Sequence, residues 1–147
     1  MSKDFRAKVK ARRCAVQALY QWQFADHKPR EIIDQFSGTP ELEAADSDYF
    51  EWIVKMVNEH QTDLRAEIES CLDRPWEQID PVERGVLYLG VVELKFAPEI
   101  PWRAVINEGV EVCKMFGAEE SHKYINGVLD KLAHKIRRAE VSAKQLS

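Results

Sequence analysis

Cysteine is scarce in this 147-residue chain, and its placement excludes two common roles. The three cysteines, Cys14, Cys71 and Cys113, lie far apart, form no CxxC pair and are odd in number. Such a pattern indicates neither a disulfide framework nor a zinc site. We therefore expect a reducing, cytoplasmic setting, and we predict no metal and no cofactor.

Long apolar runs are also missing. No stretch approaches the roughly 18 apolar residues that a membrane span requires. The N-terminus is basic but lacks the apolar segment that follows the basic residues of a signal peptide. These absences predict a soluble protein without membrane partners.

Motifs of enzyme catalysis are absent as well. The four histidines form no HExxH pair, no GxSxG occurs, and no glycine-rich loop is present that could bind a nucleotide phosphate. Pairs of carboxylates such as Glu119-Glu120 are common on solvated surfaces, so they are weak evidence for acid–base chemistry. We predict a protein that is not an enzyme and has no catalytic residues.

Charge is distributed unevenly along the chain. The 21 Lys and Arg against 25 Asp and Glu give a net charge of −4, but residues 1–13 carry +5, residues 131–147 carry +4 and the segment between them −13. We call residues 1–13 the basic arm. A basic arm on an acidic body suggests a polyanion at the arm and a different, basic partner for the body. Solvated, frayed ends are the alternative at this point.

Apolar residues recur with helical spacing almost throughout, and no segment alternates with period two. The pattern predicts an all-α protein of about seven helices. Helices are expected over residues 3–25, 30–37, 47–72 with a break near 60–62, 80–96, 101–116 and 119–138. The best start signal is Asp80 as N-cap with Pro81 at the first helical position.

Short connections between these helices predict two small bundles packed together. We assign residues 1–77 to an N-terminal bundle and 78–139 to a C-terminal bundle within one domain, and expect residues 140–147 to be a flexible tail. Four glycines lie inside predicted helices, where each is unfavourable relative to alanine. We expect close helix packing to account for Gly85, Gly90, Gly109 and Gly127.

The basic arm is the first candidate binding site. Its cations crowd into two turns of helix around more than one face and could contact successive phosphates: Lys8, Lys10, Arg12 and Arg13. The residues between them are mainly Ala and Val, whereas a membrane anchor would carry bulky apolar side chains there. Nucleic acid is the favoured ligand.

Aromatic and acidic residues supply the other candidates. Tyr124 follows Lys123, a pairing that suits stacking on an unpaired RNA base next to its phosphate, and Tyr20 lies beyond the basic arm. A tyrosine in an apolar helical repeat is more often part of the core. Glu83 and Glu120, at the starts of predicted helices, serve their own helices first and could also face a basic protein.

Three ordered segments carry a resemblance to a known family. Residues 11–20 (ARRCAVQALY), 105–117 (VINEGVEVCKMFG) and 124–130 (YINGVLD) resemble the opening helix and the two C-terminal signatures of the bacterial NusB transcription antitermination factors. The similarity runs over nearly the whole chain and is least distinctive over residues 28–77. The family also includes NusB-like domains fused to RNA cytosine methyltransferases, but this chain leaves no room for such a catalytic domain.

The resemblance implies two helical bundles and a non-catalytic role. Members of the family bind the boxA element of nascent RNA together with NusE, a small-subunit ribosomal protein, and join elongating RNA polymerase with other Nus factors. This activity suppresses termination, notably in ribosomal RNA operons. The residues implied in RNA binding are Lys8, Lys10, Arg12, Arg13, Lys123 and Tyr124. Those implied at the NusE surface or its border with RNA are Tyr20, Glu83 and Glu120.

Two other hypotheses remain open from the sequence. The chain could be an RNA-targeting helical subunit that acts with a separate RNA methyltransferase, in which case it should co-purify with a catalytic chain. It could also be a structural helical protein with incidental basic ends, which would show no RNA specificity.

Overall fold

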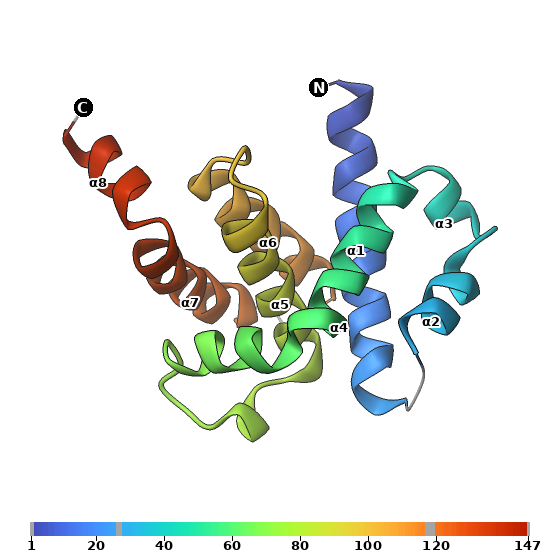
Figure 1. Cartoon of the computed structure of the whole chain (residues 1–147), viewed down its shortest axis with the longest axis horizontal. Coiled ribbons are helices and arrows are strands. Elements are labelled where there is room, and N and C mark those ends of the chain that lie inside the picture. Colours follow the sequence, from blue (N-terminus) through green and yellow to red (C-terminus); the bar gives the residue numbers. More distant parts are fainter. Residues whose placement is uncertain (1, 26–27, 117–119, 147) are drawn as a thin grey trace.

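The chain forms a bundle of helices joined by short loops (Figure 1). The computed structural model describes residues 2–25, 28–116 and 120–146, and these contain eight α-helices, one 3₁₀ turn and no strand. The all-α prediction is confirmed. The elements are α1 (Lys3–Phe24), α2 (Pro29–Phe36), α3 (Pro40–Glu43), α4 (Ser47–Glu69), η1 (Trp76–Gln78), α5 (Pro81–Phe96), α6 (Trp102–Phe116), α7 (Ser121–Ile136) and α8 (Arg138–Leu146).

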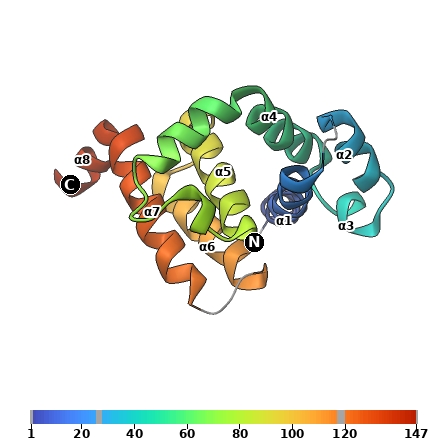
Figure 2. The same ribbon diagram turned by 90° about the horizontal axis from the view of Figure 1, so that it is seen from below.

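Helices α1–α3 lie on one side of the molecule and α5–α8 on the other, and α4 begins beside α1 and crosses toward α7 (Figure 1). Seen from below, α1 lies between α5 and the pair α2 and α3 (Figure 2). Helix α5 packs against α1 and α4 as well as against α6 and α7. Buried side chains of both groups, among them Leu19, Phe50 and Leu89, therefore form one continuous core.

Local capping signals explain where several helices begin. The Asp80 carboxylate accepts a hydrogen bond from the backbone N–H of Val82 at 2.8 Å, with Pro81 at the first position of α5. Asp46 caps α4 in the same way, accepting from the N–H of Tyr49 at 3.0 Å. The Asp80 cap occurs where the sequence places it, because a carboxylate satisfies N–H groups that the first turn leaves free.

Two internal features differ in detail from the predicted pattern. The predicted break near residues 60–62 is a kink within α4, where His60 has a non-helical backbone (φ −115°, ψ 18°). Residues 40–43, which were expected to follow the end of a helix, form the single turn α3. Pro40 begins that turn and the Thr39 hydroxyl caps it, so the residues that end one helix also start the next.

The C-terminal segment departs from the expected tail. Residues 138–146 form α8, and its Val141 belongs to the core. The Arg137 guanidinium is buried and donates to backbone carbonyls at the end of α5 and in the turn that follows, those of Glu93, Leu94, Ala97 and Ile100. The Glu140 carboxylate accepts from the N–H of Trp102, the first residue of α6, at 2.9 Å. These long-range bonds give the segment a folded role that its composition does not reveal.

Three of the four helix-interior glycines are packing positions. A Cβ on Gly109 would lie 2.8 Å from Leu129 Cδ1, and one on Gly90 would lie closer still to Leu129. A Cβ on Gly85 would meet the Val16 carbonyl at 3.4 Å. The expectation was wrong for Gly127, where a Cβ would have no neighbour within 4 Å.

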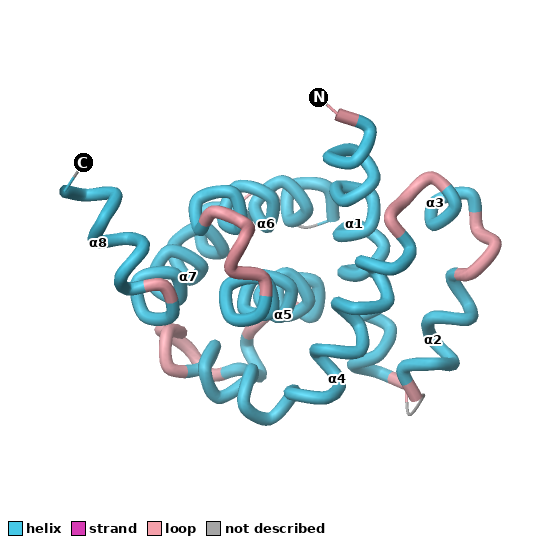
Figure 3. The backbone as a smooth tube through the Cα atoms, turned by 45° about the horizontal axis from the view of Figure 1, so that its top comes forward, coloured by secondary structure: helices cyan, strands magenta, loops and turns pink. Residues whose placement is uncertain are grey.

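Most of the connections are short loops between helices (Figure 3). Across residues 2–25, 28–116 and 120–146, no helix is both long enough and apolar enough to span a membrane.

Candidate nucleic-acid interface

The basic arm is the start of helix α1, and its side chains divide into two groups. Lys10 is exposed and Arg13 is half-buried, and neither forms an ion pair with a described residue. Lys8 keeps 42% of its side chain exposed while its ammonium donates to the Asp46 carboxylate at 2.9 Å. Lys8, Lys10 and Arg13 therefore present positive charge to solvent.

Arg12 points the other way. It is only 4% exposed, and its Nε donates to Oε2 of the fully buried Glu93 of α5 at 2.9 Å. The Tyr49 hydroxyl of α4 donates to the same oxygen, and the Arg12 guanidinium lies 5.7 Å from the Tyr49 ring centroid. The expectation that all four arm cations meet phosphate therefore does not extend to Arg12, which faces the interior because α1 packs on α5 along that side.

The electrostatics of this cluster keep Arg12 charged and Tyr49 protonated. Burial would lower the pKa of Arg12, but Glu93 outweighs it, so the pKa is raised and the guanidinium stays charged. Burial and the Glu93 carboxylate raise the pKa of Tyr49, so the phenol stays protonated and donates. Burial also raises the pKa of Glu108, whose carboxylate lies 3.9 Å from Arg12 on the α6 side. The cluster joins α1, α4, α5 and α6 beneath the arm.

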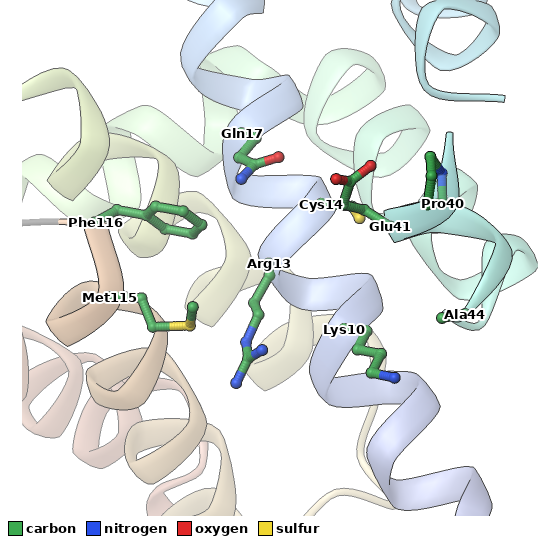
Figure 4. Close-up of a pocket in the computed structure, with 9 residues that line it drawn as sticks. All are labelled: Lys10, Arg13, Cys14, Gln17, Pro40, Glu41, Ala44, Met115 and Phe116. Atoms are coloured by element: carbon green, nitrogen blue, oxygen red, sulfur yellow. The ribbon is translucent and has the colours of Figure 1, made fainter. Parts of the chain in front are cut away.

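A cavity of about 400 Å³ opens beside the arm (Figure 4). Arg13 extends between α1 and the end of α6, with Met115 and Phe116 reaching from α6 toward α1. The cavity is mostly apolar, and Met115 is 52% exposed. Its lining residues are Lys10, Arg13, Cys14, Gln17, Pro40, Glu41, Ala44, Met115 and Phe116.

A second apolar cavity, of about 220 Å³, continues along α1. It shares Gln17 and Phe116 with the first and adds Val16, Tyr20 and Val82. Tyr20 is 44% exposed and makes an edge contact with Phe24, which is 66% exposed. We call the two cavities together the α1 groove. Tyr20 and the first turn of α5, which holds Glu83, border the same end of this groove.

The remaining predicted residues lie at the start of α7. Glu120 is exposed and adjoins Lys123, whose ammonium is 3.8 Å away. Tyr124 is half-buried against the core, and the Arg74 guanidinium covers its ring at 4.1 Å from the centroid. The ring is therefore not a bare stacking surface, because one of its faces is already occupied by a cation.

The structure groups the predicted site residues into an α1 set and an α7 set, leaving Arg12 beneath the surface. Sequence reasoning missed Met115 and Phe116, which end the helix predicted over residues 101–116. It also missed Arg74, which falls between the helices predicted over residues 47–72 and 80–96. A tertiary contact across 50 positions brings Arg74 to Tyr124, and no local pattern signals it.

An all-helical fold with exposed cations beside an apolar groove is typical of a helical binding module. No group of His, Cys, Asp or Glu that could hold a metal occurs among the described residues. The chain belongs to the NusB family, whose sequence profile matches residues 9–134.

Relatives and solved structures agree with this membership. The transcription antitermination protein NusB of Nitrosospira multiformis is 48% identical over 133 residues, covering 90% of this chain and 84% of that protein. The protein of the same name from Pseudomonas entomophila is 44% identical over 135 residues, covering 92% and 81%. The structure of T. maritima NusB superposes with a TM-score of 0.77 at 27% identity, covering 85% of this chain and 89% of that one.

A second solved structure contains a complex. It is described as the antitermination factors NusB and NusE in complex with dsRNA, and one of its chains matches with a TM-score of 0.72 at 26% identity. The match covers 86% of this chain and 96% of that chain.

Proposed function

We propose that this protein is a non-catalytic transcription antitermination factor that binds boxA RNA and the ribosomal protein NusE. The observation that carries the proposal is the α1 groove, where the exposed cations Lys10 and Arg13 adjoin an apolar surface that ends at Tyr20. Phosphates need exposed cations, while a protein partner needs desolvated apolar and aromatic anchors, and the groove offers both side by side.

The family supports the same function. The relatives at 44–48% identity are named transcription antitermination proteins, and a structural neighbour is a chain of a complex of NusB and NusE with dsRNA. These findings favour an adaptor over an RNA-targeting subunit of a methyltransferase. We further propose that the complex joins elongating RNA polymerase and other Nus factors in the cytoplasm, supporting ribosomal RNA transcription.

Each residue of the interface has an assigned role. Lys8, Lys10 and Arg13 contact RNA phosphates, and Lys123 with Tyr124 forms a second RNA contact. Arg12 acts indirectly by holding the arm on α5 through Glu93. The NusE contacts are Tyr20, Glu83 and Glu120.

The test is fluorescence anisotropy of labelled boxA RNA and of a scrambled RNA, titrated with the protein alone and with NusE. About 0.15 M salt screens weak nonspecific attraction. We expect a preference for boxA that becomes stronger when NusE is present. Equal, weak binding of both RNAs with no effect of NusE would reject the proposal.

Glu83→Lys separates the two partners. The variant places a cation at the groove end that is assigned to a basic protein, so NusE binding should weaken more than RNA binding alone. Glu31→Lys on α2 is the matched control, since Glu31 is exposed and lies on a helix that does not border the α1 groove. Equal NusE affinity of wild type and Glu83→Lys would remove Glu83 from the interface.

A further inference from the structure

A polar cavity of about 540 Å³ lies between the end of α1, the second half of α4, η1 and the first half of α5. A neighbouring cavity of about 440 Å³ extends it along α4 and shares Gln61, Arg65 and Tyr88 with it. We call the two cavities together the α4 groove. It shares no lining residue with the α1 groove, and none of its residues has a role in the proposed function.

Aromatic rings form one wall of the α4 groove. Trp22 and Trp76 each make an edge contact with Tyr88, with ring centroids 5.8 and 5.5 Å apart. Tyr88 is only 4% exposed, and its hydroxyl forms no hydrogen bond with a described residue. Burial raises the pKa of Tyr88, so the phenol stays protonated. The groove therefore contains a fixed hydroxyl donor without an acceptor.

Arg84 is a half-buried cation that lacks an anionic partner among the described residues. Its Nη2 and Nε donate to the Trp76 carbonyl at 3.0 and 3.3 Å, and its Nη1 donates to the Gln23 side-chain carbonyl at 3.4 Å. These acceptors are neutral, so they orient the guanidinium and leave its charge uncompensated. An arginine has more N–H groups than these bonds use. Buried and half-buried charges are normally paired, so Arg84 is set up to receive an anion.

The other arginine of the groove is already paired. Arg65 donates from Nε to the Glu69 carboxylate at 2.6 Å, and its Nη2 lies 3.5 Å from the Glu77 carboxylate. The charges of these three residues largely compensate one another around the groove. Arg84 is thus the cation that remains for a ligand, and Tyr88 lies four positions further along the same face of α5.

Side-chain amides line the α4 side of the groove. Asn58 is half-buried and Gln61 is exposed, and both face the cavity that holds Arg84. A side-chain amide both donates and accepts hydrogen bonds, as a peptide group does. The α4 side therefore suits the main chain of an extended peptide, whereas Arg84 and Tyr88 on the α5 side suit an acceptor with negative charge.

We propose that the α4 groove binds an acidic peptide segment of a partner protein, with one carboxylate of the segment on Arg84 and Tyr88. The guanidinium fork matches the two oxygens of a carboxylate. Tryptophan, tyrosine and arginine are also the residue types that dominate the binding energy of protein interfaces. This partner differs from the basic protein assigned to Glu83, because the α4 groove offers an uncompensated cation.

NMR titration of the ¹⁵N-labelled protein tests the proposal without RNA or NusE. The probe is a pentapeptide with blocked ends and a central glutamate, and its control has glutamine there. We expect the glutamate peptide to give saturable shifts of the indole N–H signals of Trp22 and Trp76. The signals of Trp52 and Trp102, which do not line the groove, should stay unchanged. No shift, or equal shifts with both peptides, would overturn the proposal.

Inorganic phosphate distinguishes a peptide from another anion, because a phosphate matches the same guanidinium fork. In a separate titration it should bind more weakly than the glutamate peptide, since only the peptide can also pair with Asn58 and Gln61. Tighter binding of phosphate than of the peptide would overturn the assignment of an acidic peptide.

Two variants test the residues assigned to the carboxylate. Arg84→Gln should weaken binding of the glutamate peptide by about tenfold, the effect of losing a hydrogen bond to a charged group. Arg103→Gln is the matched control, because Arg103 is an exposed arginine outside the groove, and it should bind the peptide as wild type does. Equal weakening by the two variants would show a general charge effect and reject the site.

Tyr88→Phe keeps the test decisive if loss of the Arg84 bonds to Trp76 perturbs the fold. Phenylalanine preserves the ring contacts with Trp22 and Trp76 and removes only the hydroxyl, so the variant should fold and bind the peptide about threefold or more weakly. Unchanged affinity in Tyr88→Phe would contradict the assigned geometry. Because the titrations contain neither RNA nor NusE, failure here leaves the proposed function intact, and failure of boxA binding leaves this inference intact.

Discussion

Arg12 and Arg13 are adjacent in the sequence and have opposite environments. Arg12 is buried in an ion pair with Glu93, while Arg13 lines the α1 groove without a partner among the described residues. Removing one member of a buried pair leaves an uncompensated charge, which is strongly destabilising. An exposed cation contributes little to stability but binds phosphate.

We therefore expect one alanine variant to change mainly stability and the other to change mainly RNA affinity. Arg12→Ala should lower the free energy of unfolding by about 3–5 kcal/mol, and Arg13→Ala should change it by less than about 0.5 kcal/mol. Urea unfolding measures both. At a temperature where Arg12→Ala is folded, Arg13→Ala should show the larger loss of RNA affinity; the reverse order in either measurement would contradict these roles.

Asp46 connects the arm to α4, and we expect its ion pair to make the stability of the fold depend on pH. Its hydrogen bond from Lys8, with that from the Tyr49 N–H, lowers the pKa of the carboxyl. A carboxyl whose pKa is lower in the folded state stabilises the fold above its unfolded pKa of about 3.9, and this contribution is lost as pH falls through the folded pKa.

Asp46→Asn should remove this acid-sensitive part of the stability. The difference in unfolding free energy between wild type and variant should be constant above about pH 5 and shrink below about pH 4. Urea titrations from about pH 2.5 to about pH 7 would measure it. Asp48→Asn, in the same helical turn but without an ion pair among the described residues, is the control, and an equal pH response in both variants would refute the role of Asp46.

At the scale of elements, the contact of α5 and α6 with α7 depends on glycines. Leu129 of α7 occupies the space that a Cβ on Gly90 or Gly109 would need. We expect Gly90→Ala to destabilise the protein by about 1–3 kcal/mol through overpacking, despite the better helix propensity of alanine. Denaturant unfolding with an unchanged m-value would measure it.

A double-mutant cycle assigns that cost to the helix contact. In a Leu129→Ala background the methyl group added at position 90 has room, so Gly90→Ala should cost much less there than in wild type. Additive effects of the two changes would place the strain elsewhere.

At the same scale, a helix could be predicted from the sequence when the residues that stabilise it lie close to it in the chain. The α5 start was foreseen because Asp80 and Pro81 act within one turn of their own helix. Helix α8 was not foreseen, because its anchors, Arg137 and Glu140, bond to the end of α5, the following turn and the start of α6. A segment of small and charged residues is typical of a flexible tail, and its composition does not show that it has partners elsewhere in the chain.

For the whole molecule, net charge is a poor guide to ligand choice. The chain is −4 overall, yet the arm presents exposed cations along one side of the α1 groove. If RNA binds there, the double variant Lys10→Ala, Arg13→Ala should lower the slope of log K against log salt by about 1.4, at about 0.7 per lost contact with a single strand.

Anisotropy titrations between about 0.05 and about 0.3 M salt would measure that slope, where counterion release dominates nonspecific binding. Lys55→Ala on α4 removes an exposed cation that is 3.7 Å from Glu51 and does not line the α1 groove. It should leave the slope unchanged, and a slope reduced equally by this control would show a general charge effect.

The sequence by itself determined the helices other than α3 and α8, the Asp80 cap and the basic arm, because periodicity and capping act over a few residues. It also held a signal that was misinterpreted: Arg12 lies three residues after Val9 and four before Val16, on the apolar face of its own helix. Only the tertiary structure showed that Glu93, 81 positions away, makes burial of that charge tolerable.

The surface that remains for binding was likewise decided by the tertiary structure. Periodicity gives a core residue and a groove residue the same spacing, so Tyr20, Met115 and Phe116 could be placed only once α1, α5 and α6 were docked. Arg74 meets Tyr124 for the same reason. Helix formation depends on neighbours along the chain, whereas exposure and pairing depend on contacts between distant segments, which only the folded molecule brings together.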